Sequence, residues 1–191
     1  MRAITVWPEW SWAICRLGKD VENRTWAAPS TLRIGDELAI HAGGTFGGSA
    51  HYKKISEIFT PVGEMARRAG WRMGFNGTEN TVTTYSVKNP KSVSDKVHMM
   101  ARGAVVAVAT FGGCIDPALL TDEKGWPWWA PDLFGWILRD VSVLGEPVDC
   151  RGRQGLWRLD ADVDALVRSQ LGRSGTTGSE PDESSRACVH K

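Results

Sequence analysis

The sequence has few of the features that mark secreted, membrane-spanning or metal-binding proteins. Its four cysteines lie far apart and form no CxxC pair, which argues against a zinc motif and against a disulfide framework. No run approaches the roughly 20 apolar residues that span a bilayer. The apolar stretch at the N-terminus is too short for a signal peptide and is interrupted by Pro8. We therefore expect a cytoplasmic protein with no membrane association, no metal and no other cofactor. The free and mostly buried thiols would be Cys15, Cys114, Cys150 and Cys188.

Strong net charge is also lacking. The formal net charge is only +1, so the whole chain gives no electrostatic signal for nucleic acid. The local distribution is less even, because residues 51–102 carry nine Lys and Arg against four Asp and Glu. Two interpretations stay open for this segment: a solvated face, or a basic surface that attracts phosphates.

Tryptophan, by contrast, is abundant. The chain has ten tryptophans, and most should lie in the core because each indole buries a large apolar area. Ten is more than the core of one small domain usually needs, so some could line a pocket in which a flat ring stacks. They are Trp7, Trp10, Trp12, Trp26, Trp71, Trp126, Trp128, Trp129, Trp136 and Trp157.

The residue patterns predict an α+β domain. Pro8 fits the first position of a helix that Gly18 can end in the left-handed conformation. Apolar spacing predicts a last helix after Asp160, with Val163, Leu166 and Val167 on its buried face. Between the two helices, short strands without regular βαβ alternation favour a small β-barrel with flanking helices. The expected strands and extended pieces cover residues 4–7, 19–26, 37–42, 103–113, 134–144 and 156–160.

The chain divides into a single domain, residues 1–172, and a tail. We expect an insertion at about 45–102, made of a helix at 49–59, a second helix from about 61 to 70, loops, and one strand at 81–87. Within it, residues 72–80 and 88–101 are predicted as loops. Residues 173–191 are rich in Gly and Ser, cannot bury a core, and are predicted to be disordered.

Three separated segments resemble the ASCH domain family. WPEWSWAICRLGKDVENRTW is similar to its opening signature, an aromatic-rich helix followed by a pattern of Gly18, Lys19, Glu22 and Arg24. DELAIHAGG and FGWILRDVSVLGEPVDCRGRQGLWRLD follow in the family's order. The resemblance covers about 1–44 and 103–167. It implies a barrel like that of pseudouridine synthase and archaeosine transglycosylase (PUA-like), a cleft beside the first helix, and a role with RNA or modified nucleosides.

Lys19, Glu22 and Arg24 are the first candidate site. On an extended segment Glu22 and Arg24 share a face, and Lys19 joins them if the chain turns just after Gly18. The cluster could meet a phosphate or a base edge, with Glu22 orienting the two cations. It could equally be a structural bridge that clamps the helix to the barrel.

The resemblance also raises an enzymatic alternative, with Lys19 and Glu22 as the catalytic candidates. Some ASCH-like proteins are amidohydrolases that use a Lys, a Thr and a Glu, and the Thr lies three residues after the Lys. Here that position holds Glu22, and Thr25 is displaced, which weighs against this reaction. Other members are suspected ribonucleases, but this chain offers no paired histidines, and His41 stands alone on a strand, which favours a structural role.

Further candidates lie outside the cluster. The turn from Arg151 to Gly155 could be a plain hairpin with solvated arginines, or a rim at which Arg151 and Gln154 contact phosphates. Trp26 is the best candidate to stack on a base.

The sequence thus predicts a binding module for RNA or a modified nucleotide in a cleft beside Lys19, Glu22 and Arg24. An amidohydrolase or ribonuclease acting on a modified nucleoside or RNA is the alternative. A third possibility is an adaptor whose middle segment binds another protein.

Overall fold

The structure is a computed structural model. It describes residues 1–44, 64–65, 67–68, 71–76, 81–86, 98–99, 101–118, 128–130 and 132–174. Its main part is a six-stranded sheet with the strand order β2-β8-β7-β3-β1-β9. The strands are β1 (Arg2–Val6), β2 (Val21–Arg24), β3 (Glu37–Ala42), β7 (Ala104–Ile115), β8 (Phe134–Asp149) and β9 (Leu156–Arg158).

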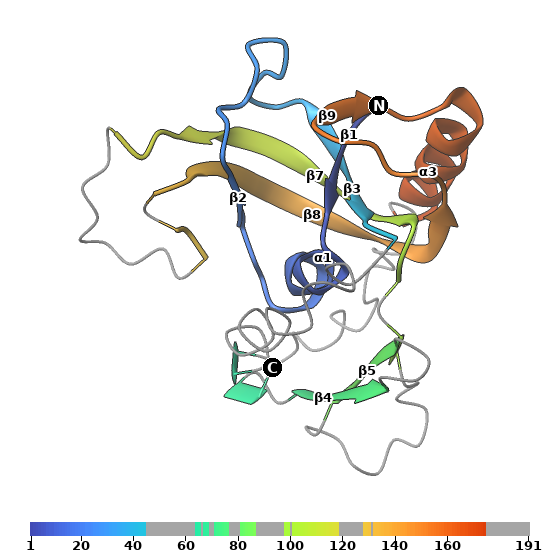
Figure 1. Cartoon of the computed structure of the whole chain (residues 1–191). Coiled ribbons are helices and arrows are strands. Elements are labelled where there is room, and N and C mark those ends of the chain that lie inside the picture. The colour runs from blue at the N-terminus through green and yellow to red at the C-terminus, as the bar shows by residue number, and fades with distance from the viewer. Residues whose placement is uncertain are drawn as a thin grey trace, which may run out of the picture.

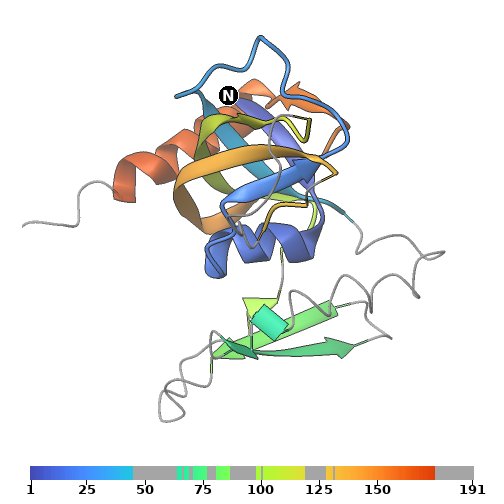
Figure 2. The ribbon, with the colours of Figure 1, turned by 90° about the vertical axis from the view of Figure 1, so that its left-hand side faces the viewer.

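The six-stranded sheet curls around its own core (Figures 1 and 2). β1 and β3 are parallel, and the remaining neighbours in the sheet are antiparallel. Helix α1 (Pro8–Arg16) lies across one end of the curled sheet, and helix α3 (Ala161–Ser174) packs against β8. The predicted α+β class and barrel-like sheet are confirmed.

Local sequence explains the elements that enclose the core. Pro8 is the first residue of α1, as predicted, and Gly18 follows the helix with φ of +68°, a conformation that costs glycine little. In β7 the run from Ala104 to Ala109 is buried throughout, as expected for a strand covered on both faces. Trp136 of β8 is completely buried and meets Trp26 and Phe111 edge to face.

β8 is longer than the sequence predicts. Residues 147–149 belong to the strand and not to the turn, because β7 continues far enough to pair with Val148 and Asp149. Pro147 is tolerated because the register between β7 and β8 shifts just before Val148, and a proline in a strand is acceptable at such an irregularity.

Part of the insertion forms a second, three-stranded sheet with the order β4-β5-β6. β5 (Thr81–Ser86) agrees with the strand predicted at 81–87. The predicted loops are wrong for β4 (Trp71–Asn76) and β6 (His98–Met99). Turn-forming residues dominate the local composition there, whereas pairing with β5 specifies the strands. Residues 64–65 and 67–68 are helical, as predicted. The predicted helix at 49–59 lies outside the described residues. So does the predicted tail, 173–191, except for Arg173 and Ser174, which end α3.

Two expectations about burial are wrong. Leu166 of α3 is 56% exposed, while Val163 and Val167 are buried, because residues four apart on this helix face the sheet and Leu166 points away from it. The three thiols that the structure describes are not mostly buried: Cys114 is exposed, and Cys15 and Cys150 are half-buried, while Cys188 lies outside the described residues. None of the helices in the described ranges is long and apolar enough to cross a membrane.

Candidate functional site

A cleft opens where the two ends of the curled sheet approach each other. β2 is at one end of the strand order and pairs only with β8, yet Arg24 reaches across to β1. Its guanidinium Nη2 donates a hydrogen bond to the carbonyl oxygen of Thr5, at 2.8 Å. We call the cleft along this contact the seam cleft. It consists of two adjoining hollows that share Thr5, Trp7, Arg24 and Trp26.

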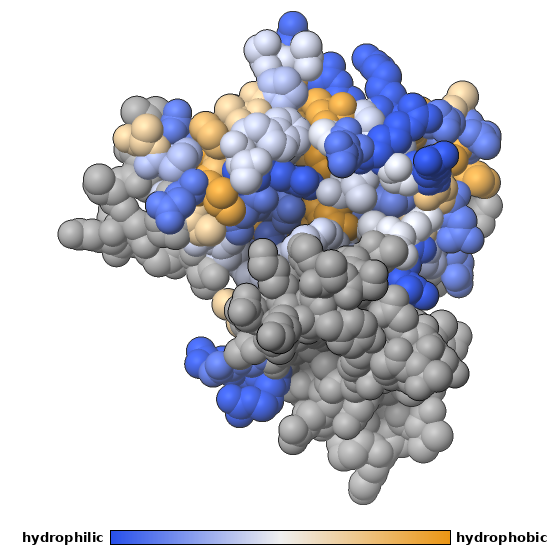
Figure 3. Space-filling model, in the orientation of Figure 1, coloured by the Kyte–Doolittle hydropathy of each residue, from blue (hydrophilic) through white to orange (hydrophobic). Residues whose placement is uncertain are grey.

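The first part, the loop hollow, has a volume of about 670 Å³ and is bounded by residues 150–155, which connect β8 to β9. Arg24, Arg151 and Arg153 line it, and no Asp or Glu is among its lining residues. Asp160 pairs with Arg153, and Glu22 pairs with both Lys19 and Arg24, from outside the walls of this hollow. With Arg151 added, this part of the seam cleft keeps a net positive charge and is suited to an anion. On the face of the molecule shown in Figure 3, hydrophilic side chains gather over β9 and α3.

The second part, the strand hollow, has a volume of about 410 Å³ and lies between β1, α1 and β2. Trp10 and Glu22 line it in addition to the four shared residues. Indole rings therefore border both hollows, beside the guanidinium of Arg24. Such a combination of flat apolar rings and cations can hold a stacked base and its phosphate.

Glu22 is the centre of a buried ionic cluster. Its carboxylate Oε2 accepts a hydrogen bond from Lys19 Nζ at 3.0 Å, and Oε1 lies 3.6 Å from Nε of Arg24. Lys19 is 2% exposed, and its ammonium also donates to the backbone carbonyl of Val21. Lys19 is not among the residues that line either hollow. Within this cluster Lys19 holds Glu22 in place, while Glu22 and Arg24 face the cleft.

The side chains of Thr5 and His41 attach the loop from Cys150 to Gly155 to the barrel. Thr5 Oγ1 donates to the carbonyl oxygen of Arg153 at 2.9 Å, and Nε2 of His41 lies 3.1 Å from the carbonyl oxygen of Cys150. Between them Gly152 lies so close to His41 that a Cβ atom would be 2.5 Å from its Cε1. The backbone that carries Arg151 and Gln154 is thereby fixed before any ligand arrives.

His41 is buried and lines the loop hollow. Burial lowers its pKa, against the opposing effect of the Cys150 carbonyl, so the imidazole is neutral at physiological pH. A neutral ring donates a hydrogen bond from one nitrogen only. With Nε2 donating to Cys150, Nδ1 is left as an acceptor, and it has no hydrogen-bond partner.

Glu9 and Cys15 are two further ionisable groups with shifted pKa values, and neither of them lines the two hollows. Glu9 of α1 is completely buried, neither of its carboxylate oxygens has a hydrogen-bond partner, and burial raises its pKa. Burial raises the pKa of the Cys15 thiol to about 11, which makes it a poor nucleophile at neutral pH. Within the described residues, no three His, Cys, Asp or Glu side chains are grouped to hold a metal ion.

The structure brings five of the six predicted ligand-binding residues to the cleft walls. Glu22 lines the strand hollow, Arg151 and Gln154 line the loop hollow, and Arg24 and Trp26 line both. Sequence reasoning missed further wall residues: Thr5, Trp7, Trp10, His41 and Arg153. Trp7 and Trp10 flank the proline that starts α1 and could have been found from their nearness to the cluster. Nothing in the sequence shows that Thr5 and His41 both contact the loop from Cys150 to Gly155. The two residues become neighbours only because β1 pairs with β3 in parallel.

Comparisons with known proteins bear on this fold. No protein-family model matches the chain, and no curated protein matches its sequence. Solved structures do resemble it. One is the crystal structure of ASCH from Zymomonas mobilis, with 13% sequence identity and a TM-score of 0.44. The similarity covers 88% of this chain and 93% of that chain. The similarity concerns the arrangement of elements alone.

Proposed function

We propose that the seam cleft binds RNA or a nucleotide, with the phosphate at the loop hollow and a base against the indole rings. One observation carries the proposal: three arginines and no acidic residue line a hollow that continues directly into a hollow bordered by tryptophans. Glu22 and Asp160 pair with Arg24 and Arg153 from outside the walls of the loop hollow, and Arg151 adds a further positive charge to it. Phosphate contacts favour arginine for its paired donors, and base stacking favours half-exposed aromatic rings.

The exposure of the tryptophans supports this assignment. Trp12, Trp129, Trp136 and Trp157 are buried, as expected for indoles that stabilise the core. The rings that line the seam cleft differ from these, because Trp7 is 39% exposed and Trp10 and Trp26 are half-buried. Rings in such positions keep surface free for a ligand. The edge-to-face contact with Trp136, at 4.7 Å between centroids, holds Trp26 in place.

The Lys19–Glu22 pair supports binding over amide hydrolysis. A lysine that acts as a base or nucleophile must lose its proton and reach the substrate. Lys19 instead is buried, bonded to Glu22 and to the Val21 carbonyl, and absent from the walls of the cleft. We propose that it fixes the orientation of Glu22, whose carboxylate can then accept a hydrogen bond from a base.

Arg151→Ala tests the proposal. We expect weaker binding of hexauridylate, measured by calorimetric titration, and a loss that is larger at low salt than at high salt. A phosphate contact releases counterions, so the slope of log affinity against log salt should fall by about 0.7 for one contact to a single strand.

Arg158→Ala is the matched control, because it removes the same charge from an exposed position on β9 that lines neither hollow. We expect this variant to bind as the wild type does. Equal losses for the two variants at every salt concentration would show that net charge alone attracts the RNA, and would contradict a phosphate site in the loop hollow.

A further inference from the structure

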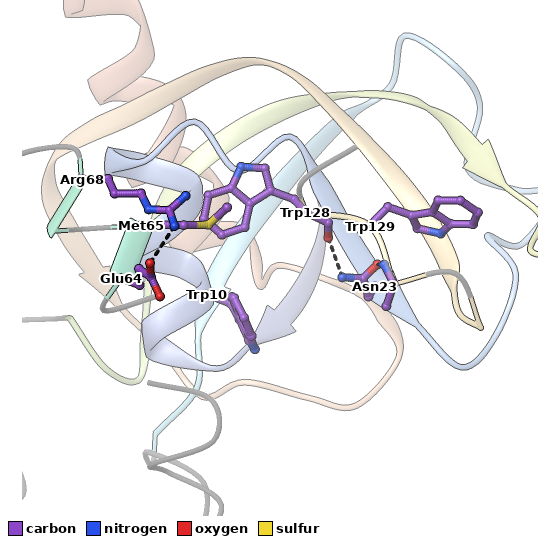
Figure 4. Close-up of a pocket in the computed structure, with 8 residues that line it drawn as sticks. Trp10, Asn23, Glu64, Met65, Arg68, Trp128 and Trp129 are labelled. Carbon is purple, nitrogen blue, oxygen red and sulfur yellow. Dashed lines mark hydrogen bonds and ion pairs between the residues drawn. The ribbon is translucent and has the colours of Figure 1, made fainter. Parts of the chain in front are cut away.

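A third hollow adjoins the seam cleft at the end away from the loop. It has a volume of about 290 Å³ and lies between α1, β2, the helical residues 64–65 and 67–68, and the segment 128–130 (Figure 4). It shares Trp10 and Asn23 with the strand hollow. Because the loop and strand hollows also share residues, the three hollows follow one another across the surface. We call this third one the tryptophan hollow.

Half-buried tryptophans recur along this path. Trp26 belongs to the loop and strand hollows, Trp10 to the strand and tryptophan hollows, and Trp128 to the tryptophan hollow. Lys19 Nζ lies 5.5 Å from the centroid of the Trp10 ring, a cation–π contact that orients the indole. Each hollow is thus bordered by at least one indole ring that is partly exposed to solvent.

Trp128 is positioned by a strand of the barrel. The side-chain amide of Asn23 donates to the Trp128 carbonyl oxygen at 2.7 Å and accepts from the amide of Ala130 at 2.9 Å (Figure 4). These two bonds hold the 128–130 segment beside β2. The neighbouring Trp129 is buried and donates from its indole to the Leu133 carbonyl oxygen, so Trp128 is the ring of this segment that is left for a ligand.

Charge changes along the path. Three arginines and no acidic residue line the loop hollow, although Glu22 and Asp160 pair with two of them from outside its walls. In the tryptophan hollow the acidic Glu64 is itself a lining residue and pairs with Arg68 at 2.6 Å. One end therefore attracts phosphate, and the other offers mainly apolar ring surface. A protein that binds a single strand without reading its sequence combines a positive groove with successive stacking rings.

We propose that a single strand of RNA, and not an isolated nucleotide, is the natural occupant, with one nucleotide in each of the three hollows. The inference rests on the proposed function and adds the length of the ligand and its path. A mononucleotide would occupy the loop hollow alone, with its phosphate at the arginines and its base against Trp7 or Trp26, and would leave the tryptophan hollow empty.

Calorimetric titration with uridine monophosphate, diuridylate, triuridylate and hexauridylate tests the path. Affinity should rise about tenfold for each added nucleotide, the order of magnitude of one stacked base, and should level off after the trimer. Trp128→Ala should weaken hexauridylate binding about tenfold and leave uridine monophosphate binding unchanged. Trp128→Phe, which keeps an aromatic face, should retain most of the affinity for hexauridylate and guards against a loss caused by misfolding.

The results of these titrations distinguish the proposed three-hollow path from the proposed binding of RNA or a nucleotide in the seam cleft. Equal affinities for uridine monophosphate and hexauridylate, both weakened by Arg151→Ala, would overturn the extended path and leave the proposed function in place. A Trp128→Ala variant that binds hexauridylate as tightly as the wild type would also overturn the path. No binding of any of these four probes would overturn the proposed function together with it.

Discussion

At the scale of single residues, Gly152 and His41 decide the shape of the loop hollow. The glycine allows the backbone to pass directly over the imidazole, and the imidazole holds that backbone through the Cys150 carbonyl oxygen. Neither residue needs to touch a ligand to matter. Arg151 and Gln154, which lie on either side of Gly152 in the chain, depend on this contact for their positions.

Gly152→Ala should therefore disturb both folding and binding. The added Cβ would lie 2.5 Å from Cε1 and 2.8 Å from Nδ1 of His41, so the loop must move outward. We expect the free energy of unfolding to fall by about 1–3 kcal/mol, the usual cost of overpacking, and nucleotide affinity to fall with it. Urea unfolding and titration of uridine monophosphate measure the two effects.

Gly145→Ala is the control for that substitution. A Cβ at this exposed position of β8 would lie 3.6 Å from Oε1 of Gln170, an ordinary contact. We expect its stability and affinity to match the wild type. If the two alanine variants behaved alike, the close approach of Gly152 to His41 would have no energetic importance.

His41 should make stability depend on pH. Burial lowers its pKa in the folded state below the ordinary value of 6.5, so below that pH the unfolded chain binds a proton that the folded chain resists. Stability should be highest above pH 6.5 and should fall as the pH drops below it, at up to about 1.4 kcal/mol per pH unit.

The free energy of unfolding, followed between about pH 5 and 8 in the wild type and in His41→Gln, isolates this contribution. Glutamine can still donate to the Cys150 carbonyl oxygen but does not titrate. The difference between the two proteins should shrink towards acid pH. The raised pKa of Glu9 acts in the opposite direction, since its buried carboxyl favours the protonated form, and it cancels in the comparison. A constant difference across the range would contradict a buried neutral imidazole.

At the scale of elements, β2 combines three tasks in four residues. Val21 is buried in an apolar cluster with Ile115 and Trp129. Glu22 and Arg24 face the seam cleft, and Asn23 binds the 128–130 segment. The alternation of side chains along a strand makes this division possible.

Asn23 gives a prediction at this scale. Asn23→Ala removes two hydrogen bonds to backbone groups of a part-buried segment, so we expect a loss of about 1–3 kcal/mol in the free energy of unfolding. Asn23→Asp can still accept from Ala130 but cannot donate to Trp128, and its loss should be intermediate. Urea unfolding of the three proteins gives the order. Identical stabilities would show that the segment is held by packing alone.

The strand that carries these tasks was only partly predictable. The sequence predicts an extended segment after Gly18 and the pairing of Glu22 with Arg24, because both follow from local geometry. The hydrogen bonds from Arg24 to Thr5 and from Asn23 to Trp128 were not predictable. They join residues that lie 19 and 105 positions apart in the chain, respectively. Such contacts depend on which strands become neighbours, and local pattern does not determine that.

At the scale of the whole molecule, the core strands and helix boundaries are predictable from the sequence. The way in which the two ends of the curled sheet meet is less predictable. Buried apolar runs such as that of β7 identify central strands, and the helix boundaries at Pro8 and Gly18 follow from backbone chemistry. The sequence does not show where the sheet ends meet. That meeting places the arginines of the 150–155 loop beside Trp26, and it creates the seam cleft.

The short, charged β2 has a consequence for the behaviour of the protein in concentrated solution. β2 ends the strand order, and the free edge of a sheet can recruit a strand from another copy of the chain, which is how many proteins aggregate. Here the edge is only four residues long and carries Glu22 and Arg24, with Arg24 turned towards β1. Charged side chains on a short edge strand oppose such pairing. The residues that would receive a nucleic acid therefore also protect this edge from self-association.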